Sequence, residues 1–367
     1  MRMFLVGVLL AFVADSAAAQ EPETELTLDY TADAFAVVDG GYDQDATVAH
    51  QAVLSLTTPV AEAWTFTGRV AATFGDSLSE RAIGDVQGVQ GAYAGGDAIW
   101  LYEASLTRTF ASGSLSFGRL SSGDVFGAVG VMEDEFVNSA FSSNGGAISI
   151  NTPGRLPAPA SSWGVTGDWR PHEGVTARGG VFLSDPERAT AERPRDLAFD
   201  AQDGVLAFGE LAVQASERLE LGVGAWSDSG RFSAFDDRTV RSNAGAYAWA
   251  AGRLAGGAEG RRLEGFALVQ IAPRDDRSLQ PLAAFAGLSL RAPFAGRADD
   301  ALNLAVGSGR FSDDSGLDGS ETVIELNYRY ALTDQISLRP DLQYVINPGG
   351  GIADDALVAG VQLALTL

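Results

Sequence analysis

Charged and amide side chains recur at every second position near the carboxyl end of the chain. They are Glu325, Asn327, Arg329, Arg339, Asp341 and Gln343. Arginine forks beside carboxylates offer fixed donors and acceptors for the hydroxyl groups of a solute. In an aqueous channel the same groups create a transverse electric field. A pair such as Glu325 and Arg329 could equally form a salt bridge along a wall, and the spacing allows either role.

The positions between these polar residues are apolar. Ile324, Leu326 and Tyr328 share one parity, and the alternation continues to Leu363 and Leu365. A period of two indicates β-strands with one apolar and one polar face. Such strands, separated by polar loops, are typical of a β-barrel with lipid outside and water inside.

Alternating runs of this kind predict an all-β protein, a 16-stranded antiparallel transmembrane β-barrel of the outer-membrane porin type. The expected strands lie near 24–37, 48–58, 63–74, 98–110, 114–120, 162–170, 174–184, 204–214, 218–228, 243–254, 263–272, 281–292, 300–311, 321–331, 335–346 and 356–367. Short and long connections alternate along most of the chain. A further strand over 145–151 would break that alternation, so we assign these residues to a loop. An even strand number places both termini in the periplasm.

The amino terminus predicts a secretory signal over residues 1–19. Arg2 is followed by a short apolar run and an Ala17–Ala19 cleavage motif, so the barrel domain is expected over 20–367. No later run approaches the ~18 apolar residues of a membrane-spanning helix. The sequence contains no cysteine, which excludes disulfide and thiol chemistry, and its net charge of -23 excludes a general nucleic-acid binder.

Aromatic and acidic residues gather at the expected ends of the strands. Trp64 and Phe74 share the outward parity at opposite ends of one strand, as do Trp163 and Trp169 on another, which predicts aromatic girdles. Acidic pairs such as 313–314 fall in loops. They fit either a solvated rim or a divalent-cation bridge to lipopolysaccharide.

The connection over 121–161 is too long to be only a link. We expect it to fold into the lumen as a constriction, with Glu133, Asp134 and Glu135 facing wall arginines. An external flap is the alternative. By parity, Arg69 and Arg178 face inward from the wall.

Two aromatic residues also take inward parity, Phe182 and Trp226. Beside polar groups, such a ring could stack on the apolar face of a sugar. Trp226 could instead lie at the outer end of its strand and pack under a loop.

Several segments resemble the carbohydrate-selective porin (OprB) family. The most specific is ETVIELNYRYALTDQISLRPDLQYVINPGG followed by DALVAGVQLALTL, and others are LYEASLTRTF with GSLSFGRL, and SSWGVTGDWRPHEGVTARGGVF. The resemblance implies an outer-membrane barrel that passes mono- or oligosaccharides by facilitated diffusion through an arginine-containing constriction. It implies no cofactor or metal. Its expected partners are outer-membrane lipid, lipopolysaccharide and the barrel-assembly machinery, for a monomer or a homotrimer.

The matched segments carry several of the candidate arginines. Arg178, Arg329 and Arg339 lie in them and face inward by parity. Arg119 is matched in GRL, but its parity is outward unless a bulge at Gly118 turns it. The chain lacks the Gly-Asp-Trp-Gly-Gly type of segment that begins many members, and it ends in Leu367 where they have an aromatic residue.

Two other functions compete with sugar passage. The charge of -23 favours a general, weakly cation-preferring porin, because acidic mouths concentrate cations. A barrel hydrolase would need a histidine beside a serine and a carboxylate. His50 has the parity of the lipid face and His172 falls in a short turn, so we assign no catalytic residue and expect no enzyme activity.

Overall fold

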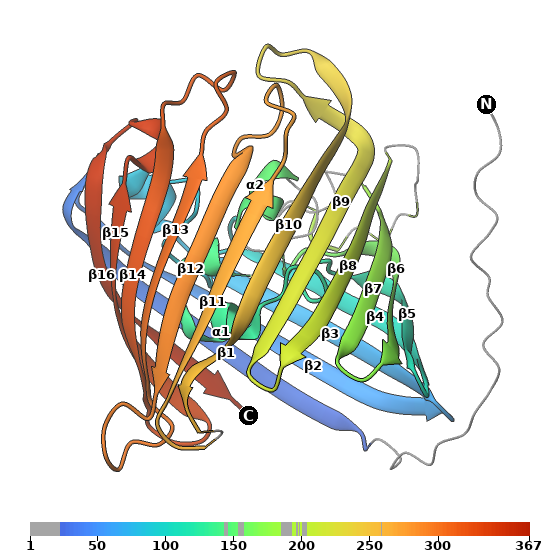
Figure 1. Cartoon of the computed structure of the whole chain (residues 1–367). Helices are drawn as coiled ribbons and strands as arrows, with labels where there is room; N and C mark the ends of the chain where they lie inside the picture. Colours follow the sequence, from blue (N-terminus) through green and yellow to red (C-terminus); the bar gives the residue numbers. More distant parts are fainter. Residues whose placement is uncertain are drawn as a thin grey trace.

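The computed structural model describes residues 23–367 except 143–145, 153–157, 185–192, 196, 198, 200–203 and 258, so the expected signal at 1–19 lies outside the described residues. Sixteen antiparallel strands form a closed barrel in which β16 pairs with β1, confirming the expected fold (Figure 1). The strands are β1 (Glu25–Gly41), β2 (Ala46–Ala61), β3 (Trp64–Gly75), β4 (Ala98–Phe110), β5 (Gly113–Leu120), β6 (Ser162–His172), β7 (Val175–Leu183), β8 (Val205–Ser216), β9 (Leu219–Ser233), β10 (Thr239–Gly256), β11 (Arg262–Ile271), β12 (Leu282–Arg291), β13 (Ala301–Arg310), β14 (Ser320–Ala331), β15 (Ile336–Ile346) and β16 (Asp354–Thr366).

Short helices occur only in the connections, among the described residues. They are η1 (Ser79–Ile83), α1 (Gly130–Glu135), η2 (Ser139–Phe141), α2 (Ala147–Asn151) and η3 (Pro348–Gly350). The described part of the segment over 145–151 forms α2 and is therefore not a strand, as expected. No helix in the described part of the chain is long and apolar enough to cross a membrane.

The hairpin of β9 and β10 is longer than the sequence predicts. Burial continues to alternate from Trp226 through Phe232, and the ladder pairs Thr239 with Ser233. The serine, glycine and aspartate residues of this stretch hide the alternation, because a strand that leaves the membrane meets water on its outer face and needs no apolar residues there.

Both ends of the described chain lie at one end of the barrel, which we call the terminal end. Leu28 and Leu367 exchange two backbone hydrogen bonds of 2.9 Å. Figure 1 shows mostly short turns at this end, apart from the connection between β12 and β13, and most of the longer connections at the opposite end, which we call the long-loop end.

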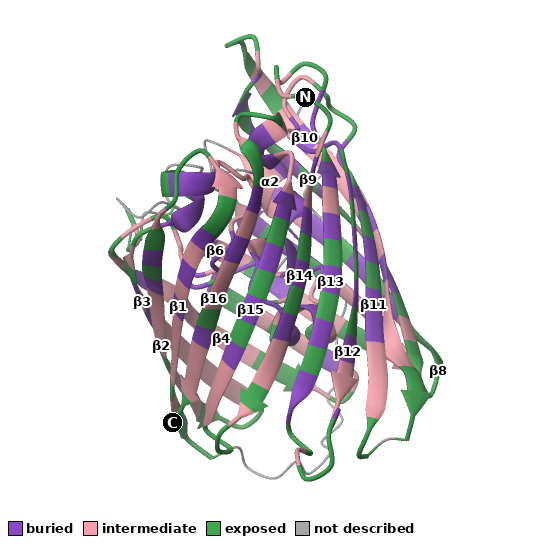
Figure 2. Ribbon diagram, turned by 90° about the vertical axis from the view of Figure 1, so that its left-hand side faces the viewer, coloured by how far each residue is buried: buried purple, intermediate pink, exposed green. Residues whose placement is uncertain are grey.

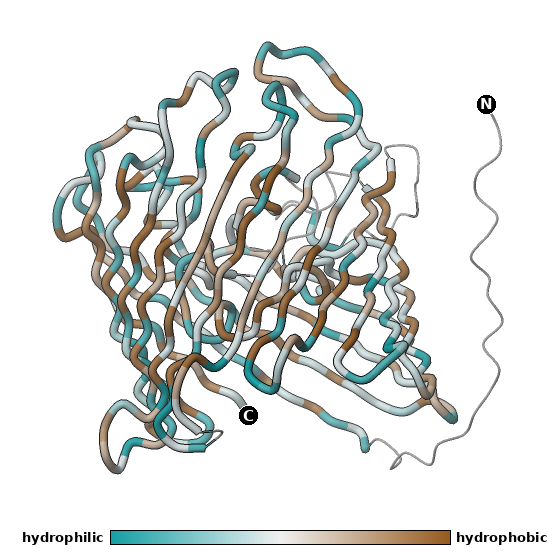
Figure 3. Tube along the Cα trace, in the orientation of Figure 1, coloured by the Kyte–Doolittle hydropathy of each residue, from teal (hydrophilic) through white to brown (hydrophobic). Residues whose placement is uncertain are grey.

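The outer face of the barrel is apolar. Val165 is 46% exposed, Leu304 48% and Trp169 52%, although all three are hydrophobic. Figure 2 shows exposed and buried residues alternating along the strands, and Figure 3 shows hydrophobic positions distributed over the same wall. His50 stacks on Phe74, with ring centroids 4.6 Å apart. This histidine therefore lies among outward-facing aromatic rings.

Inside the barrel, large aromatic rings lie over glycines of the neighbouring strand. Tyr247 of β10 pairs in register with Gly224 of β9, and an ideal Cβ on Gly224 would come within 2.2 Å of Tyr247 Cζ. Trp226 pairs with Gly245 in the same way. The glycines let flat rings lie against the wall, so this side of the lumen offers a broad apolar surface.

Candidate functional site

The described part of the connection over 121–161 lies inside the barrel and packs on this aromatic wall. Phe136 and Phe141 contact Phe266, with ring centroids 5.8 and 6.3 Å apart. Phe141 also contacts Phe285 edge to face at 6.3 Å. Edge-to-face pairs of this kind are favourable beyond the area they bury. The wall and the loop thus share one apolar core, which fills that side of the lumen.

Both aromatic residues considered for sugar stacking belong to this core. Phe182 is 1% exposed and packs edge to face on Phe126 and Phe208, while Trp226 is 4% exposed. A ring already covered by protein has no open face for a solute. Between the two roles left open for Trp226, its burial favours packing, and the idea that Phe182 stacks on sugar is wrong for the same reason.

The acidic end of α1 meets the wall arginines. Oε1 of Glu135 lies 2.5 Å from Nη1 of Arg291, and Oε2 lies 3.2 Å from Nε of Arg329. Arg339 donates from Nη2 to the backbone carbonyl of Asp134 at 2.8 Å. These arginines therefore hold the loop in place instead of projecting freely into the lumen.

Glu325 binds the next residues of the same loop. Its carboxylate accepts hydrogen bonds from the backbone N–H groups of Val137 and Asn138 at 2.8 and 2.9 Å. The Asn327 side chain of the same strand also donates to Glu325 at 2.7 Å, and Glu325 does not pair with Arg329 along the wall. Asp341 is 6% exposed and lies opposite Asn327 in the ladder, so it is part of the same buried polar layer.

A further wall carboxylate holds the start of the loop. Glu210 accepts a hydrogen bond from the backbone N–H of Gly127 at 2.9 Å and forms an ion pair with Arg178 at 2.6 Å. The hydroxyl of Tyr247 donates to it at 2.8 Å. Arg178 therefore faces inward, and its charge is balanced by a carboxylate that also anchors the loop.

A second connection, over 76–97, is held inside by the same device. Glu321 accepts backbone hydrogen bonds from Val86 and Gln87 at 2.9 Å, and Asp33 accepts one from Ala92 at 2.8 Å. Charge-assisted bonds of this kind are stronger than neutral ones. The alternation of polar and apolar residues does not show that this loop folds into the barrel. The inward-facing carboxylates at the ends of the strands are the feature of the sequence that could indicate it.

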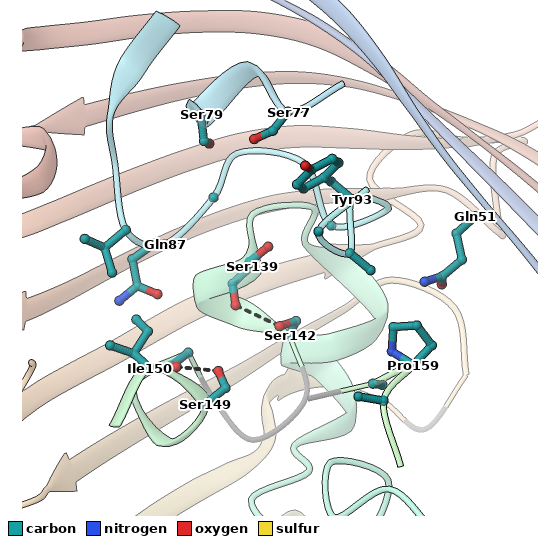
Figure 4. A pocket seen from close by; sticks show the side chains of 18 of the residues that line it. Gln51, Ser77, Ser79, Gln87, Tyr93, Ser139, Ser142, Ser149, Ile150 and Pro159 are labelled. Atoms are coloured by element: carbon teal, nitrogen blue, oxygen red, sulfur yellow. Dashed lines mark hydrogen bonds between the residues drawn. The ribbon is translucent and has the colours of Figure 1, made fainter. Parts of the chain in front are cut away.

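Two hollows lie on the other side of the lumen, along β2–β4. An outer hollow of about 540 Å³ is lined by residues of β2, β4 and the loops over 76–97 and 139–160 (Figure 4). An inner hollow of about 450 Å³ includes Asp29, Ser55 and Arg69 in its lining. Gln51 and Tyr102 line both hollows. The two hollows are therefore adjacent at these side chains.

A polar cluster surrounds this junction. Nη1 of Arg69 lies 2.8 Å from Asp124 of the loop, and Nε lies 3.2 Å from Glu103 of β4. The hydroxyl of Tyr102 donates to Asp124 at 2.7 Å. Burial raises the pKa of Asp124, against the opposing effect of its bonds to Tyr102 and Arg69. One carboxylate thus ties the loop to the wall beside the open passage.

Tyr102, Glu103 and Asp124 are absent from the residues singled out in the sequence. For Tyr102 and Glu103 the reason is a register shift: Arg69 pairs with Glu103 whereas Val70 pairs with Leu101, so Tyr102 is an extra residue. A bulge places two consecutive side chains on one face, which strict alternation does not foresee. Asp124 lies in the connection between β5 and β6, where strand parity makes no prediction.

Glu133 and Arg119 are two further residues that the sequence suggests for the constriction. Glu133 is half-buried in α1, and burial, with the carboxylates of Asp124 and Asp134, raises its pKa to about 8. Arg119 pairs with Ala104 and Trp163 without a register shift, so the ladder has no bulge at Gly118. Arg119 is nevertheless 2% exposed, and therefore does not extend into lipid.

A closed barrel of this width, with an apolar belt and a polar lumen narrowed by an inward loop, defines an outer-membrane porin. The profile of the carbohydrate-selective porin, OprB family, matches residues 39–367, and the chain belongs to that family. It is thus a channel for the facilitated diffusion of small hydrophilic solutes, with sugars as the solute class.

Known proteins agree with this assignment. Porin B of Pseudomonas aeruginosa is 23% identical over 92% of this chain and 86% of its own length. The high-pH structure of Pseudomonas putida OprB superposes with a TM-score of 0.85 at 19% identity, covering 94% of each chain. Salmonella typhi OmpF, in complex with daunomycin, gives 0.58 at 11% identity, covering 94% of this chain and 97% of that one. These structures support the barrel fold.

Proposed function

We propose that sugars cross this porin along β2–β4, through the outer hollow, past Gln51, Tyr102 and Arg69, and into the inner hollow. The observation that carries the proposal is that Gln51 and Tyr102 line both hollows. The aromatic side of the lumen is closed by the loop over 121–161, so it offers no comparable path. The loop acts as the constriction.

The junction has the chemistry that a polyol requires. Arg69 is a donor and Asp124 an acceptor, and the Arg69 guanidinium lies 5.5 Å from the centre of the Tyr102 ring. A solute with many hydroxyls can exchange its water shell for such groups as it passes. Arg291, Arg329 and Arg339 act mainly as anchors of the loop in this proposal, because their side chains contact it directly.

We also propose that the terminal end faces the periplasm. Mostly short turns at the end that holds both ends of the described chain, and long connections at the other, are the arrangement of bacterial outer-membrane barrels. The outer hollow then opens toward the cell exterior.

The second candidate is a general porin with weak cation preference. The net charge of -23 favours it, as do the carboxylates that line the hollows, including Glu25 and Asp29 in the inner one. Such groups raise the local concentration of cations.

Single-channel recording in planar bilayers separates the two candidates. We expect glucose to interrupt the ion current in a saturable manner. If the current falls only as bulk conductivity falls, and solutes pass according to size alone, the channel is a general porin. A reversal potential measured under a salt gradient then gives its charge preference, and an anion preference would contradict the second candidate.

A further inference from the structure

We propose that the outer hollow is a carbohydrate-binding subsite that accepts neutral and amine-bearing sugars and disfavours acid sugars. This inference rests on the proposed function, because it assumes that sugars enter from the long-loop end. It concerns the hollow that borders the polar cluster of Arg69 and Asp124 at Tyr102, and it names a chemical class within the carbohydrates.

Two inward loops build the subsite from opposite sides. The loop over 76–97 contributes Ser77, Ser79 and Tyr93, and the loop over 121–161 contributes Ser139 and Ser149. Figure 4 shows Tyr93 and Ser139 on these facing segments. The volume of about 540 Å³ falls within the range of ~300–1,000 Å³ typical of small-molecule sites. Hydroxyl-rich walls of this kind suit a solute that both donates and accepts hydrogen bonds.

Two acceptor oxygens in this lining lack a hydrogen-bond donor among the described residues. Gln87 is 5% exposed, and its Nε2 donates to Gln280 at 2.8 Å while its Oε1 has no partner. Asp85 accepts from the backbone N–H of Gly88 at 2.9 Å through Oδ2, while Oδ1 has no partner. Buried acceptors without donors are unfavourable. The hydroxyl and amine groups of a sugar supply the missing donors.

An aromatic ring, Tyr93, and acidic side chains also line the outer hollow. Tyr93 is only partly buried, and its hydroxyl donates to Glu80 at 3.3 Å, which orients the ring at the edge of the hollow. Such a ring can pack on the C–H face of a sugar. The acidic side chains among the described lining residues are Glu80 and Asp85. Burial raises the pKa of Asp85. The exposed carboxylate of Glu80 repels an acid sugar and attracts an amine-bearing one.

Current-noise analysis of the purified full-length protein tests the subsite. Glucose, glucosamine and sodium gluconate are added at matched ionic strength to the long-loop side, and the dissociation constant for block is measured for each. For the unmodified protein we expect glucosamine to block more tightly than glucose, and gluconate at least about tenfold more weakly than glucose. Tyr93→Ala and Gln87→Leu should each weaken the block by glucose about tenfold. Ser308→Ala, whose side chain bonds Thr322 of the next strand at outward-parity positions, is the matched control and should leave the block unchanged.

Each of three outcomes would overturn a different part of the proposal. If no sugar blocks the unmodified channel, the proposed function fails. If glucose blocks it and Tyr93→Ala leaves that block unchanged, sugars are recognised elsewhere and the subsite is refuted while the function stands. If gluconate blocks as tightly as glucose, the selectivity for sugar class is refuted. Gel mobility of the unheated protein verifies barrel formation for every variant, and Tyr93→Ala decides the matter if Gln87→Leu does not assemble.

Discussion

The carboxylate of Glu135 lies 3.2 Å from Nε of Arg329, although 194 residues separate the two in sequence. The other oxygen of the same carboxylate lies 2.5 Å from Arg291, and the Glu135 side chain is only 1% exposed. One loop acid therefore balances two cations on β12 and β14. This contact fixes α1 against the wall and leaves the passage on the opposite side of the lumen.

Replacing Glu135 by Gln should loosen the loop over 121–161. Arg329 would lose its counter-charge in a partly buried site, where the removal of one partner costs up to ~3–5 kcal/mol, and Arg291 would keep only its ion pair with Glu264 at 3.0 Å. We expect a lower temperature for the loss of the compact barrel band on gels and a noisier, larger single-channel conductance. Glu259→Gln, at an exposed turn, is the control. Equal behaviour of the two variants would show that the ion pairs do not hold the loop.

Replacing Glu321 by Gln should release the loop over 76–97. The carboxylate accepts backbone hydrogen bonds from Val86, Gln87 and Gly349, and an amide would present a donor to one or more of these N–H groups. A buried donor without an acceptor costs ~1–3 kcal/mol. Protease added to the long-loop side of reconstituted vesicles should cut this loop faster than in the unmodified protein. An unchanged cleavage rate would contradict the anchoring role.

A methyl group at Gly224 should destabilise the barrel. Its ideal Cβ lies 2.2 Å from Cζ of Tyr247, and that ring is held by the bond from its hydroxyl to Glu210. Overpacking of this kind costs ~1–3 kcal/mol. Gly209→Ala on the neighbouring strand is the matched control, because no atom lies within 4 Å of its ideal Cβ. The thermal midpoint of barrel unfolding should fall for Gly224→Ala and remain unchanged for Gly209→Ala.

Ion selectivity should depend on pH through Glu133. Its pKa is raised to about 8, so the carboxyl is mainly neutral at pH 7 and ionises as the pH rises through 8. A new negative charge then appears near Asp124, and cation preference should increase between pH 7 and 9. Because the folded protein holds this proton more tightly than the unfolded chain, stability falls as the pH rises from the usual carboxyl value of 4.5 to about 8, and it levels off above that. Reversal potentials of Glu133→Gln should lack this pH dependence, and a persisting shift would assign it to another group.

Removing the guanidinium of Arg69 should change the conductance and the ion selectivity at the junction of the two hollows. The substitution Arg69→Ala leaves the carboxylates of Glu103 and Asp124 without their common cation. We expect a larger conductance and a reversal potential shifted toward cations. Arg69→Lys keeps the charge but loses the fork that reaches both carboxylates. It should retain most of the charge preference, and if it behaves like Arg69→Ala, geometry matters more than charge.

Wherever the pairing of the strands is regular, the sequence predicts which face of the barrel wall a strand residue occupies. Arg178, Arg329 and Arg339 bind inward partners because their neighbours in sequence are apolar and turn outward. The sequence does not predict the orientation of Tyr102 and Glu103, because a register shift puts both side chains on the same face. The sequence likewise does not predict that Phe182 and Trp226 are buried, because their burial depends on a loop that covers them.

The sequence by itself determined the strands, their two faces and the family, because lipid and water impose a period of two that each strand records locally. It could also indicate that the loop over 121–161 is too long to be only a link. The tertiary structure decided which side of the lumen that loop closes. Glu135, Glu325 and Glu210 reach their partners only after closure brings distant strands to one wall, and the cost of burying an unpaired charge then selects a single arrangement.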